Sequence, residues 1–117
     1  MMFGDRLASC VSDHTRGIVQ GAYSQEGATY TKMAETFTIA STGVASHFGE
    51  MTVEKCGGRA GCQNMVRGLF AGGSPGTNVI DMITIQTTGN AQDFGDLSRS
   101  QHSLCGMCDS HGGLGGY

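Results

Sequence analysis

The chain has 117 residues, a formal net charge of −3 and 15% charged residues, a balance that gives no basic surface for nucleic acid or an anionic membrane. Its 20 glycines accompany a single proline, which sets it apart from a disordered Pro/Gly-rich linker. No run approaches the roughly 20 apolar residues that cross a bilayer, and residues 1–10 lack the features of a signal peptide. We therefore expect one small domain that binds no nucleic acid, inserts into no membrane and folds where it is made.

A motif of phenylalanine, glycine and an acid occurs three times, as Phe3–Asp5, Phe48–Glu50 and Phe94–Asp96. The last two belong to longer similar stretches, residues 33–50 and 79–96, which align at a constant offset of 46 residues. Within these stretches, seven of twelve consecutive positions are identical. Repetition at one spacing indicates a repeat architecture, and it has to be interpreted before any single residue is.

An Arg-Gly pair followed by apolar residues marks the start of each unit, at Arg16 and again at Arg67. We interpret residues 1–117 as a single domain of two repeats flanked by partial ones, with segments of about 1–15, 16–66, 67–111 and 112–117. The residues that define the repeat are Arg16, Gly17, Gly43, Phe48, Gly49, Arg67, Gly68, Gly89, Phe94 and Gly95.

Strands separated by glycine turns are the expected elements of each repeat. The β-branched stretches Met33–Ile39 and Val79–Ile85 predict the clearest strands. A Thr-Gly step after each stretch predicts a turn, with Gly43 and Gly89 free to take a positive φ. No stretch keeps apolar residues at helical spacing for three turns without a glycine. The sequence therefore predicts an all-β protein.

The repeat has three recognisable parts: Arg-Gly-apolar-apolar-x-Gly-Gly over Arg67–Gly73, the strand and Phe-Gly-acid segment over Val79–Leu97, and a cysteine before the next unit. This combination resembles the kelch-like repeats in structural proteins of tailed phages that infect marine cyanobacteria. A period of 45 to 51 residues also fits a β-propeller blade. The resemblance implies about two kelch-like propeller blades in a virion structural protein: a tail fibre, tail-associated or capsid-decorating protein. It further implies other virion proteins as partners, a location in the virion after synthesis in the host cytoplasm, and neither catalytic residues nor a cofactor.

Two blades are too few for a closed ring, since propellers close with roughly four to eight. An isolated pair would leave blade faces and strand edges exposed to other chains. We therefore predict a homo-oligomer, a trimer that completes a ring of about six blades, with the terminal fragments shared between subunits. A two-layer β-sandwich formed by the two repeats is the alternative, and it would need no partner.

Metal-ligating residue types stand at regular spacing in the run from His102 through Cys105 and Cys108 to His111. Two histidines and two cysteines are a ligand set that zinc accepts. However, Cys108 follows Phe94 at the interval that separates Cys62 from Phe48, so it belongs to the repeat pattern. A spacing of three along a strand also sends successive side chains to opposite faces. We therefore predict no metal at these four residues.

Carboxylates recur in two pairs, Glu35 with Asp81 and Glu50 with Asp96. This recurrence favours a solvated strand face or a turn hydrogen bond over paired catalytic acids. Arg16 and Arg67 are expected to pair with such carboxylates between blades, because a planar guanidinium group suits that role. No local motif supports a cysteine or histidine nucleophile, so we predict that the chain is not an enzyme.

Two functions remain from the sequence. The first is a structural component of a phage particle that acts through assembly contacts. The alternative is an oligomeric, lectin-like propeller that binds a host surface glycan and serves host adhesion.

Overall fold

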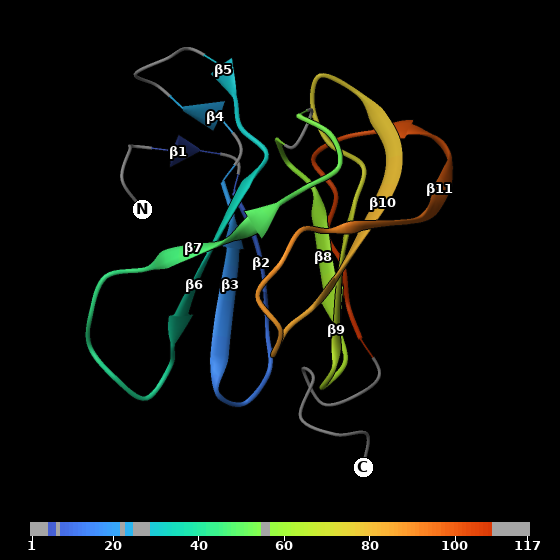
Figure 1. The fold of residues 1–117 in the computed structure, drawn as a ribbon. Helices are drawn as coiled ribbons and strands as arrows, with labels where there is room; N and C mark the ends of the chain where they lie inside the picture. The colour runs from blue at the N-terminus through green and yellow to red at the C-terminus, as the bar shows by residue number, and fades with distance from the viewer. Residues whose placement is uncertain (1–4, 7, 22, 25–28, 55–56, 109–117) are drawn as a thin grey trace.

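The computed structural model describes residues 5–6, 8–21, 23–24, 29–54 and 57–108. Every regular element in these residues is a β-strand, and the strands form three antiparallel sheets (Figure 1). Two of the sheets have four strands each, and we call them sheet 1, in the order β2-β3-β6-β7, and sheet 2, in the order β11-β10-β9-β8. The all-β prediction is therefore confirmed.

Sheet 1 consists of β2 (Ser9–Ser12), β3 (Arg16–Gln20), β6 (Met33–Thr38) and β7 (Ser46–Glu50). Sheet 2 consists of β8 (Ala60–Gln63), β9 (Arg67–Ala71), β10 (Thr77–Thr84) and β11 (Gln92–Gln101). A small third sheet holds β1 (Asp5–Arg6), β4 (Tyr23–Ser24) and β5 (Thr29–Tyr30). The strands predicted from the β-branched stretches are confirmed as β6 and β10. Sheets 1 and 2 are both meanders, since their strands pair in chain order.

The two four-stranded sheets share the same pairing register. Ile18 lies opposite Thr36 in sheet 1, and their repeat counterparts Leu69 and Met82 lie opposite each other in sheet 2. Each sheet also has a register shift at one and the same place, between residues 34 and 35 and between residues 80 and 81. A bulge of this kind leaves one residue of the neighbouring strand without a pairing partner and changes the direction of its side chain.

An Asx turn leads into the second strand of each sheet. Asp13 Oδ1 accepts hydrogen bonds from the backbone N–H groups of Thr15 and Arg16, at 2.9 and 2.8 Å. Asn64 Oδ1 does the same for the two equivalent backbone groups of its own repeat, at 2.8 and 2.7 Å. A short side chain that bonds to its own backbone two residues on is the usual chemistry of such turns. It sets the start of the strand at the Arg-Gly pair.

The two Thr-Gly turns differ in conformation. Gly43 has φ of 152° and uses the freedom of glycine, whereas Gly89 has no positive φ. The turn at Gly89 is held against β7, because Ala91 N–H donates to Glu50 O at 2.8 Å and Glu50 N–H donates to Asn90 Oδ1 at 3.1 Å. Among the described residues, no backbone hydrogen bond joins the turn at Gly43 to another sheet. Contact with sheet 1 therefore accompanies the different turn at Gly89.

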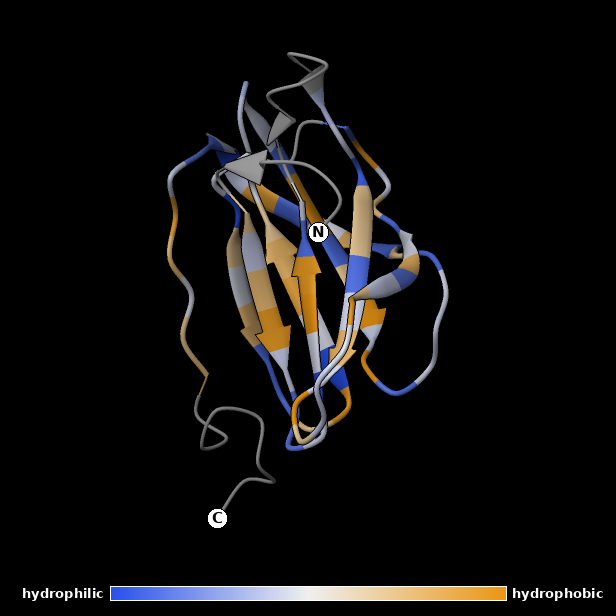
Figure 2. Ribbon diagram, turned by 90° about the vertical axis from the view of Figure 1, so that its left-hand side faces the viewer, coloured by the Kyte–Doolittle hydropathy of each residue, from blue (hydrophilic) through white to orange (hydrophobic). Residues whose placement is uncertain are grey.

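Sheets 1 and 2 enclose one shared core. Seen from the side, their strands run next to each other and carry most of the hydrophobic residues (Figure 2). The buried apolar residues come from both repeats: Val11, Ile18, Ala34, Phe48, Met51, Phe70, Ile83 and Ile85. The chain is thus a pair of packed four-stranded sheets, a layout that two propeller blades and a β-sandwich have in common.

Substituting Gly49 tests the contact between β7 and the β10–β11 turn. A Cβ at Gly49 would overlap the backbone carbonyl of Gly89, so we expect Gly49→Ala to lower the free energy of unfolding by about 1–3 kcal/mol, the usual range for overpacking. Gly89→Ala is the matched control, because its Cβ would meet no atom and its φ is not positive. Urea denaturation followed by circular dichroism measures both. Equal stability of the two variants would contradict the contact.

Candidate functional site

Sheets 1 and 2 are stacked so that equivalent faces of the two sheets point in the same direction. We call the face that carries Ile18 in sheet 1, and its counterpart Leu69 in sheet 2, the front face of each sheet. The opposite, back face carries Phe37 in sheet 1 and its counterpart Ile83 in sheet 2. Ile18 and Ile83 lie together in the shared core, so the front face of sheet 1 packs on the back face of sheet 2. The back face of sheet 1 and the front face of sheet 2 stay open.

Glycines let β2 approach sheet 2 closely. A Cβ at Gly61 would lie 2.6 Å from Cys10 O, and one at Gly68 would lie 2.6 Å from Val11 Cγ2. A side chain at either position would therefore push the sheets apart. Gly68 belongs to the predicted repeat set, and its place in this contact gives a physical reason for glycine there.

A buried ion pair lies beside this contact. Arg59, just before β8, places Nη1 2.6 Å from Oδ2 of Asp81 on β10, and both side chains are fully buried. Nη2 of the same arginine donates to the carbonyl oxygens of Phe70 and Val79, at 2.8 and 3.0 Å. Thr52, which follows β7, donates its hydroxyl to the other oxygen of Asp81. The guanidinium group therefore ties three segments of sheet 2 together, and the carboxylate ties sheet 2 to the segment after sheet 1.

These contacts correct two predictions. Asp81 and Glu35 are 0% and 8% exposed, so the expected solvated position is wrong for both, whereas Glu50 and Asp96 are exposed. Sheet 1 covers the face of sheet 2 that carries Asp81. Glu35 is buried although it lies on the back face of sheet 1. Arg16 was expected to pair with a carboxylate between blades. Its Nη1 instead donates to the carbonyl oxygen of Ile85, at 3.1 Å, while Arg67 is exposed. The arginine that binds a buried carboxylate is Arg59, and this pair lies within sheet 2, between the start of β8 and β10.

Asp13 joins the two repeats through a hydrogen bond from the Gln86 side chain. Burial alone would raise the pKa of Asp13, but hydrogen bonds from Gln86 and from the Thr15 and Arg16 backbone outweigh burial and hold the pKa below its ordinary value of 3.8. A lowered carboxyl pKa means that the folded state favours the ionised form. This carboxylate therefore stabilises the fold above about pH 4, and the contribution is lost as the pH falls through the folded pKa.

Neutralising Asp13 gives a prediction with a defined pH window. Asn64 shows that asparagine forms the same turn, so Asp13→Asn should fold and lose about 1 kcal/mol of unfolding free energy at neutral pH, the difference that ionisation makes to its hydrogen bonds. The gap between wild type and variant should shrink below about pH 4. Glu54→Gln, at an exposed carboxylate, serves as the control for loss of charge. Urea titrations at several pH values measure the gap, and a gap that grows on acidification would contradict the prediction.

Repeat counterparts differ sharply in exposure on the two open faces. Phe94 on the front face of sheet 2 is 52% exposed, whereas its counterpart Phe48 is 1% exposed. Phe37 and Ile39 on the back face of sheet 1 are 44% and 52% exposed, whereas their counterparts Ile83 and Ile85 are 2% and 0% exposed. We call the contact between the front face of sheet 1 and the back face of sheet 2 the inner contact. The large apolar side chains on the two open faces are exposed, whereas their repeat counterparts are buried in the inner contact.

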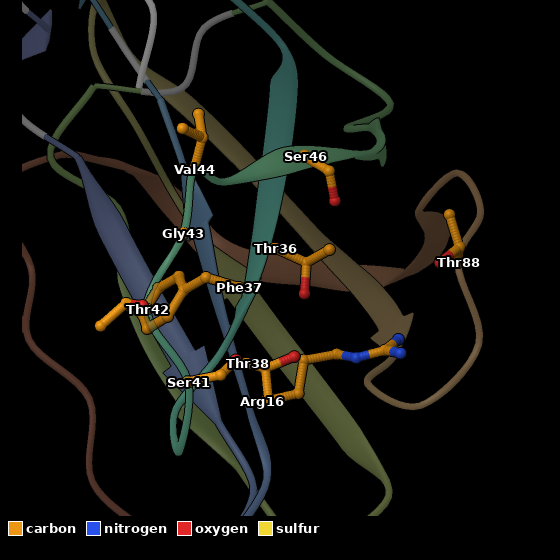
Figure 3. A pocket seen from close by; sticks show the side chains of 10 residues that line it. All are labelled: Arg16, Thr36, Phe37, Thr38, Ser41, Thr42, Gly43, Val44, Ser46 and Thr88. Carbon is orange, nitrogen blue, oxygen red and sulfur yellow. The ribbon is translucent and has the colours of Figure 1, made fainter.

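Two small hollows occupy equivalent places in the repeats. The first has a volume of about 270 Å³ at the end of β6, and Figure 3 shows the Arg16 guanidinium group reaching toward the turn that carries Thr88. The second, at the end of β10, has a volume of about 160 Å³. All the residues around the second hollow are repeat counterparts of residues around the first. The first is larger because Arg16 and Thr88, from outside its own hairpin, add further walls.

A wider groove of about 740 Å³ lies on the front face of sheet 2. Leu69 and Phe94 form its floor, and Met107, 92% exposed, stands at its margin. The segment that carries Met107 is held along β8, because Leu104 N–H donates to Gly58 O at 3.1 Å and Gly106 approaches Gly61 O closely. Exposed apolar surface beside a groove is typical of contact sites in proteins.

The zinc candidates are not brought together as a set. His102 and Cys105 are exposed, Cys108 is half-buried near Cys62, and His111 lies outside the described residues. Within residues 5–108, apart from the undescribed gaps, no three His, Cys, Asp or Glu side chains gather closely enough to hold a metal ion. Burial, and to a lesser degree the neighbouring Cys108, raises the pKa of the Cys62 thiol. The described cysteines are free thiols: Cys10, Cys62, Cys105 and Cys108.

The repeat-defining residues divide between the inner contact and the open regions. Those in the contact between sheets are Arg16, Phe48, Gly49, Gly68 and Gly89. Those on open faces, strand edges or free turns are Gly17, Gly43, Arg67, Phe94 and Gly95. Gly17 lies under the ring of Phe37, on the open back face of sheet 1. Sequence reasoning missed Arg59. The one sequence signal for it is its position directly before β8, which begins with Ala-Gly.

The described part of the chain holds no helix long and apolar enough to span a membrane. A scan against protein-family models finds no match to this chain, and a search of curated proteins finds none either.

Proposed function

We propose that this chain is a structural protein of a phage particle, a tail fibre, tail-associated or capsid-decorating protein, that acts through assembly contacts and not through catalysis. The observation that supports it is the pair of open, apolar sheet faces, whose repeat counterparts are buried against each other within the chain. A protein that presents such faces is suited to packing against further sheets. The phage assignment rests on the resemblance of Val79–Leu97 to kelch-like repeats in structural proteins of cyanobacterial tailed phages.

In this proposal sheets 1 and 2 are two blades of a kelch-like propeller, closed by a homo-oligomer, with three copies giving a ring of about six blades. Other virion proteins are its partners, and it reaches the virion after synthesis in the host cytoplasm. The same-way stacking of the two meanders supports blades over a sandwich, because successive blades of a propeller pack front to back.

The test is the protein content of purified particles. Particles banded from a lysate that produces this chain should contain it in a fixed ratio to the major capsid protein, measured by quantitative mass spectrometry. Antibodies against the chain should also label one part of the particle in electron micrographs. A chain abundant in the lysate but absent from washed particles would overturn the proposal.

A second candidate function, binding of a host surface glycan, is favoured by the paired hollows. The first is lined mainly by serine and threonine hydroxyls, with the half-exposed Phe37 ring and Arg16 at its walls (Figure 3). Hydroxyl donors and acceptors beside an apolar ring match the surface of a sugar. Repetition of the hollow in both units would give each chain two such sites.

Glycan-array binding of the purified chain tests this second function. Thr42→Val removes one hydroxyl from the first hollow and should weaken binding up to about tenfold, the worth of one hydrogen bond. Ser98→Ala, at an exposed residue of β11 outside the three cavities, is the control and should bind as wild type. Equal binding by both variants would place any glycan elsewhere than in this hollow.

A further inference from the structure

The inner contact between sheets 1 and 2 shows how two units of this repeat recognise each other. Phe48 on the front face of sheet 1 shares a core with Ile83 and Ile85 on the back face of sheet 2. Arg16 at the edge of the same front face donates to Ile85 O. The two surfaces in this contact are unlike, and each of them has its repeat counterpart on an open face of the same molecule.

We infer that the open front face of sheet 2 binds the open back face of sheet 1 in a second copy of the chain, so that copies stack head to tail. The inference rests on the assembly role proposed above, and it adds which faces meet, in which orientation, and which residues make the contact. A second copy fits the open front face of sheet 2 because it presents the back face of its own sheet 1. The repeat counterpart of that face, the back face of sheet 2, already binds a front face within each chain.

The residues of this contact follow from the inner one by the repeat offsets. Phe94 takes the place of Phe48 and packs on Phe37 and Ile39 of the second copy, which stand where Ile83 and Ile85 stand within the chain. All three side chains are between 44% and 52% exposed in the single chain. Their burial removes large apolar surface from water.

Polar groups are matched in the same way. Arg67 is exposed and corresponds to Arg16, so it donates to Ile39 O of the second copy as Arg16 donates to Ile85 O. The turn at Gly43 of the second copy reaches the strand edge at Gly95, as the turn at Gly89 reaches Gly49. A Cβ at Gly49 would overlap the carbonyl of Gly89, whereas a Cβ at its counterpart Gly95 would meet no atom. The place that the turn fills in the inner contact is therefore empty beside Gly95.

One segment of the chain competes with this contact. Residues 104–108 run along β8 at the inner margin of the front face, held by Leu104 N–H donating to Gly58 O and by Leu104 packing near Gly72. In the inner contact the equivalent place, beside β2 at the margin of sheet 1, is occupied by β8 of sheet 2. A second copy that docks fully brings its own β2 to this margin, so the segment moves aside as the copies associate.

A two-fold contact between copies is the competing geometry. It would place Phe94 against Phe94 and leave the back face of sheet 1, with Phe37 and Ile39, exposed in both copies. A head-to-tail contact covers both open faces, and unlike surfaces are the mark of a heterologous interface. The two geometries give opposite results when each face is disabled separately.

The test is complementation between two variants of the full chain. Phe37→Asp disables the back face of sheet 1, and Phe94→Asp disables the front face of sheet 2. Size-exclusion chromatography with light scattering should show wild type as an oligomer and each variant alone as a monomer. Their mixture should form a complex of one copy of each variant and grow no further, because a single intact pair of faces remains.

Controls separate loss of binding from loss of fold. Far-ultraviolet circular dichroism checks that both variants keep their strands, and Ile39→Asp replaces Phe37→Asp if that variant unfolds. Met65→Asp, at a turn residue that is 47% exposed and outside both faces, should remain oligomeric. Self-association of Phe37→Asp with no gain on mixing would show the two-fold contact and overturn the inference. The variant Leu104→Ser loosens residues 104–108 and so removes the competing segment. If both the wild type and Leu104→Ser stay monomeric throughout a concentration series, the inference is overturned as well.

The result is independent of where the chain is found. Head-to-tail oligomers of a chain absent from purified particles would overturn the proposed phage role and leave this inference standing. A chain present in particles whose variants fail to complement would do the reverse.

Discussion

Replacing Arg59 by methionine is expected to lower the free energy of unfolding by about 3–5 kcal/mol, the cost of leaving one member of a buried ion pair without its partner. Both side chains of the Arg59–Asp81 pair are fully buried, with 2.6 Å between Nη1 and Oδ2. Methionine fills a similar volume but leaves the Asp81 carboxylate in the interior without a counter-charge. Thr52 alone then bonds to that carboxylate, and its hydroxyl cannot replace a cation.

Urea denaturation followed by circular dichroism measures this loss, and two further variants make it specific. The double variant Arg59→Met with Asp81→Leu removes both charges and should recover most of the stability, because a buried pair can be exchanged for apolar residues at little cost. Lys32→Met breaks the ion pair between Lys32 and Glu50, at 3.5 Å on the surface, and should cost less than about 1 kcal/mol. Similar losses of unfolding free energy for Arg59→Met and Lys32→Met would show that the buried Arg59–Asp81 pair does not stabilise the fold.

Truncating Phe70 to alanine is expected to cost about 3–5 kcal/mol, since a large-to-small change in a packed core loses transfer free energy and leaves a cavity. Phe70 lies on β9, is fully buried, and belongs to the core that both sheets share. A small domain has roughly 5–15 kcal/mol of stability in total. This single change therefore brings the chain close to unfolding at room temperature.

Thermal and urea unfolding of Phe70→Ala should show a large fall in the midpoint, whereas Phe70→Leu should recover more than half of it. Val66→Ala is the control for loss of an exposed apolar side chain, as Val66 is 52% exposed at the turn before β9. It should lie within about 0.5 kcal/mol of wild type. A small effect of Phe70→Ala would mean that the two sheets do not share a single core.

The strands were predictable where local chemistry decides the outcome. The β-branched stretches became β6 and β10, and the repeat offset correctly pointed to matching segments, down to a bulge at the same place in both sheets. The conformation of Gly89 was not predictable in this way. Its turn has the same Thr-Gly sequence as that of Gly43, and the difference in conformation accompanies contact with β7, which no local pattern encodes.

The buried polar contacts could not be predicted from the repeat, because a repeat identifies only residues that recur. Arg59 does not recur, since Ala8 stands at the corresponding place before β2. Asp81 does recur, as Glu35, and was assigned to a solvated face because alternation along a strand shows two faces without showing which one a neighbouring layer covers. For the same reason the exposure of Phe48 and Phe94, which share one motif, differs in a way that only the packing of the sheets determines.

The same-way stacking of the two sheets makes the molecule directional, with a different surface at each end. Addition to such a stack does not stop by itself: it ends when the last surface meets the first and a ring closes, or it continues as a fibre. Duplication of one unit within the gene would lengthen the stack without requiring a new contact surface. If copies join as inferred above, the number of subunits in a closed ring can change in evolution while the contact itself is conserved.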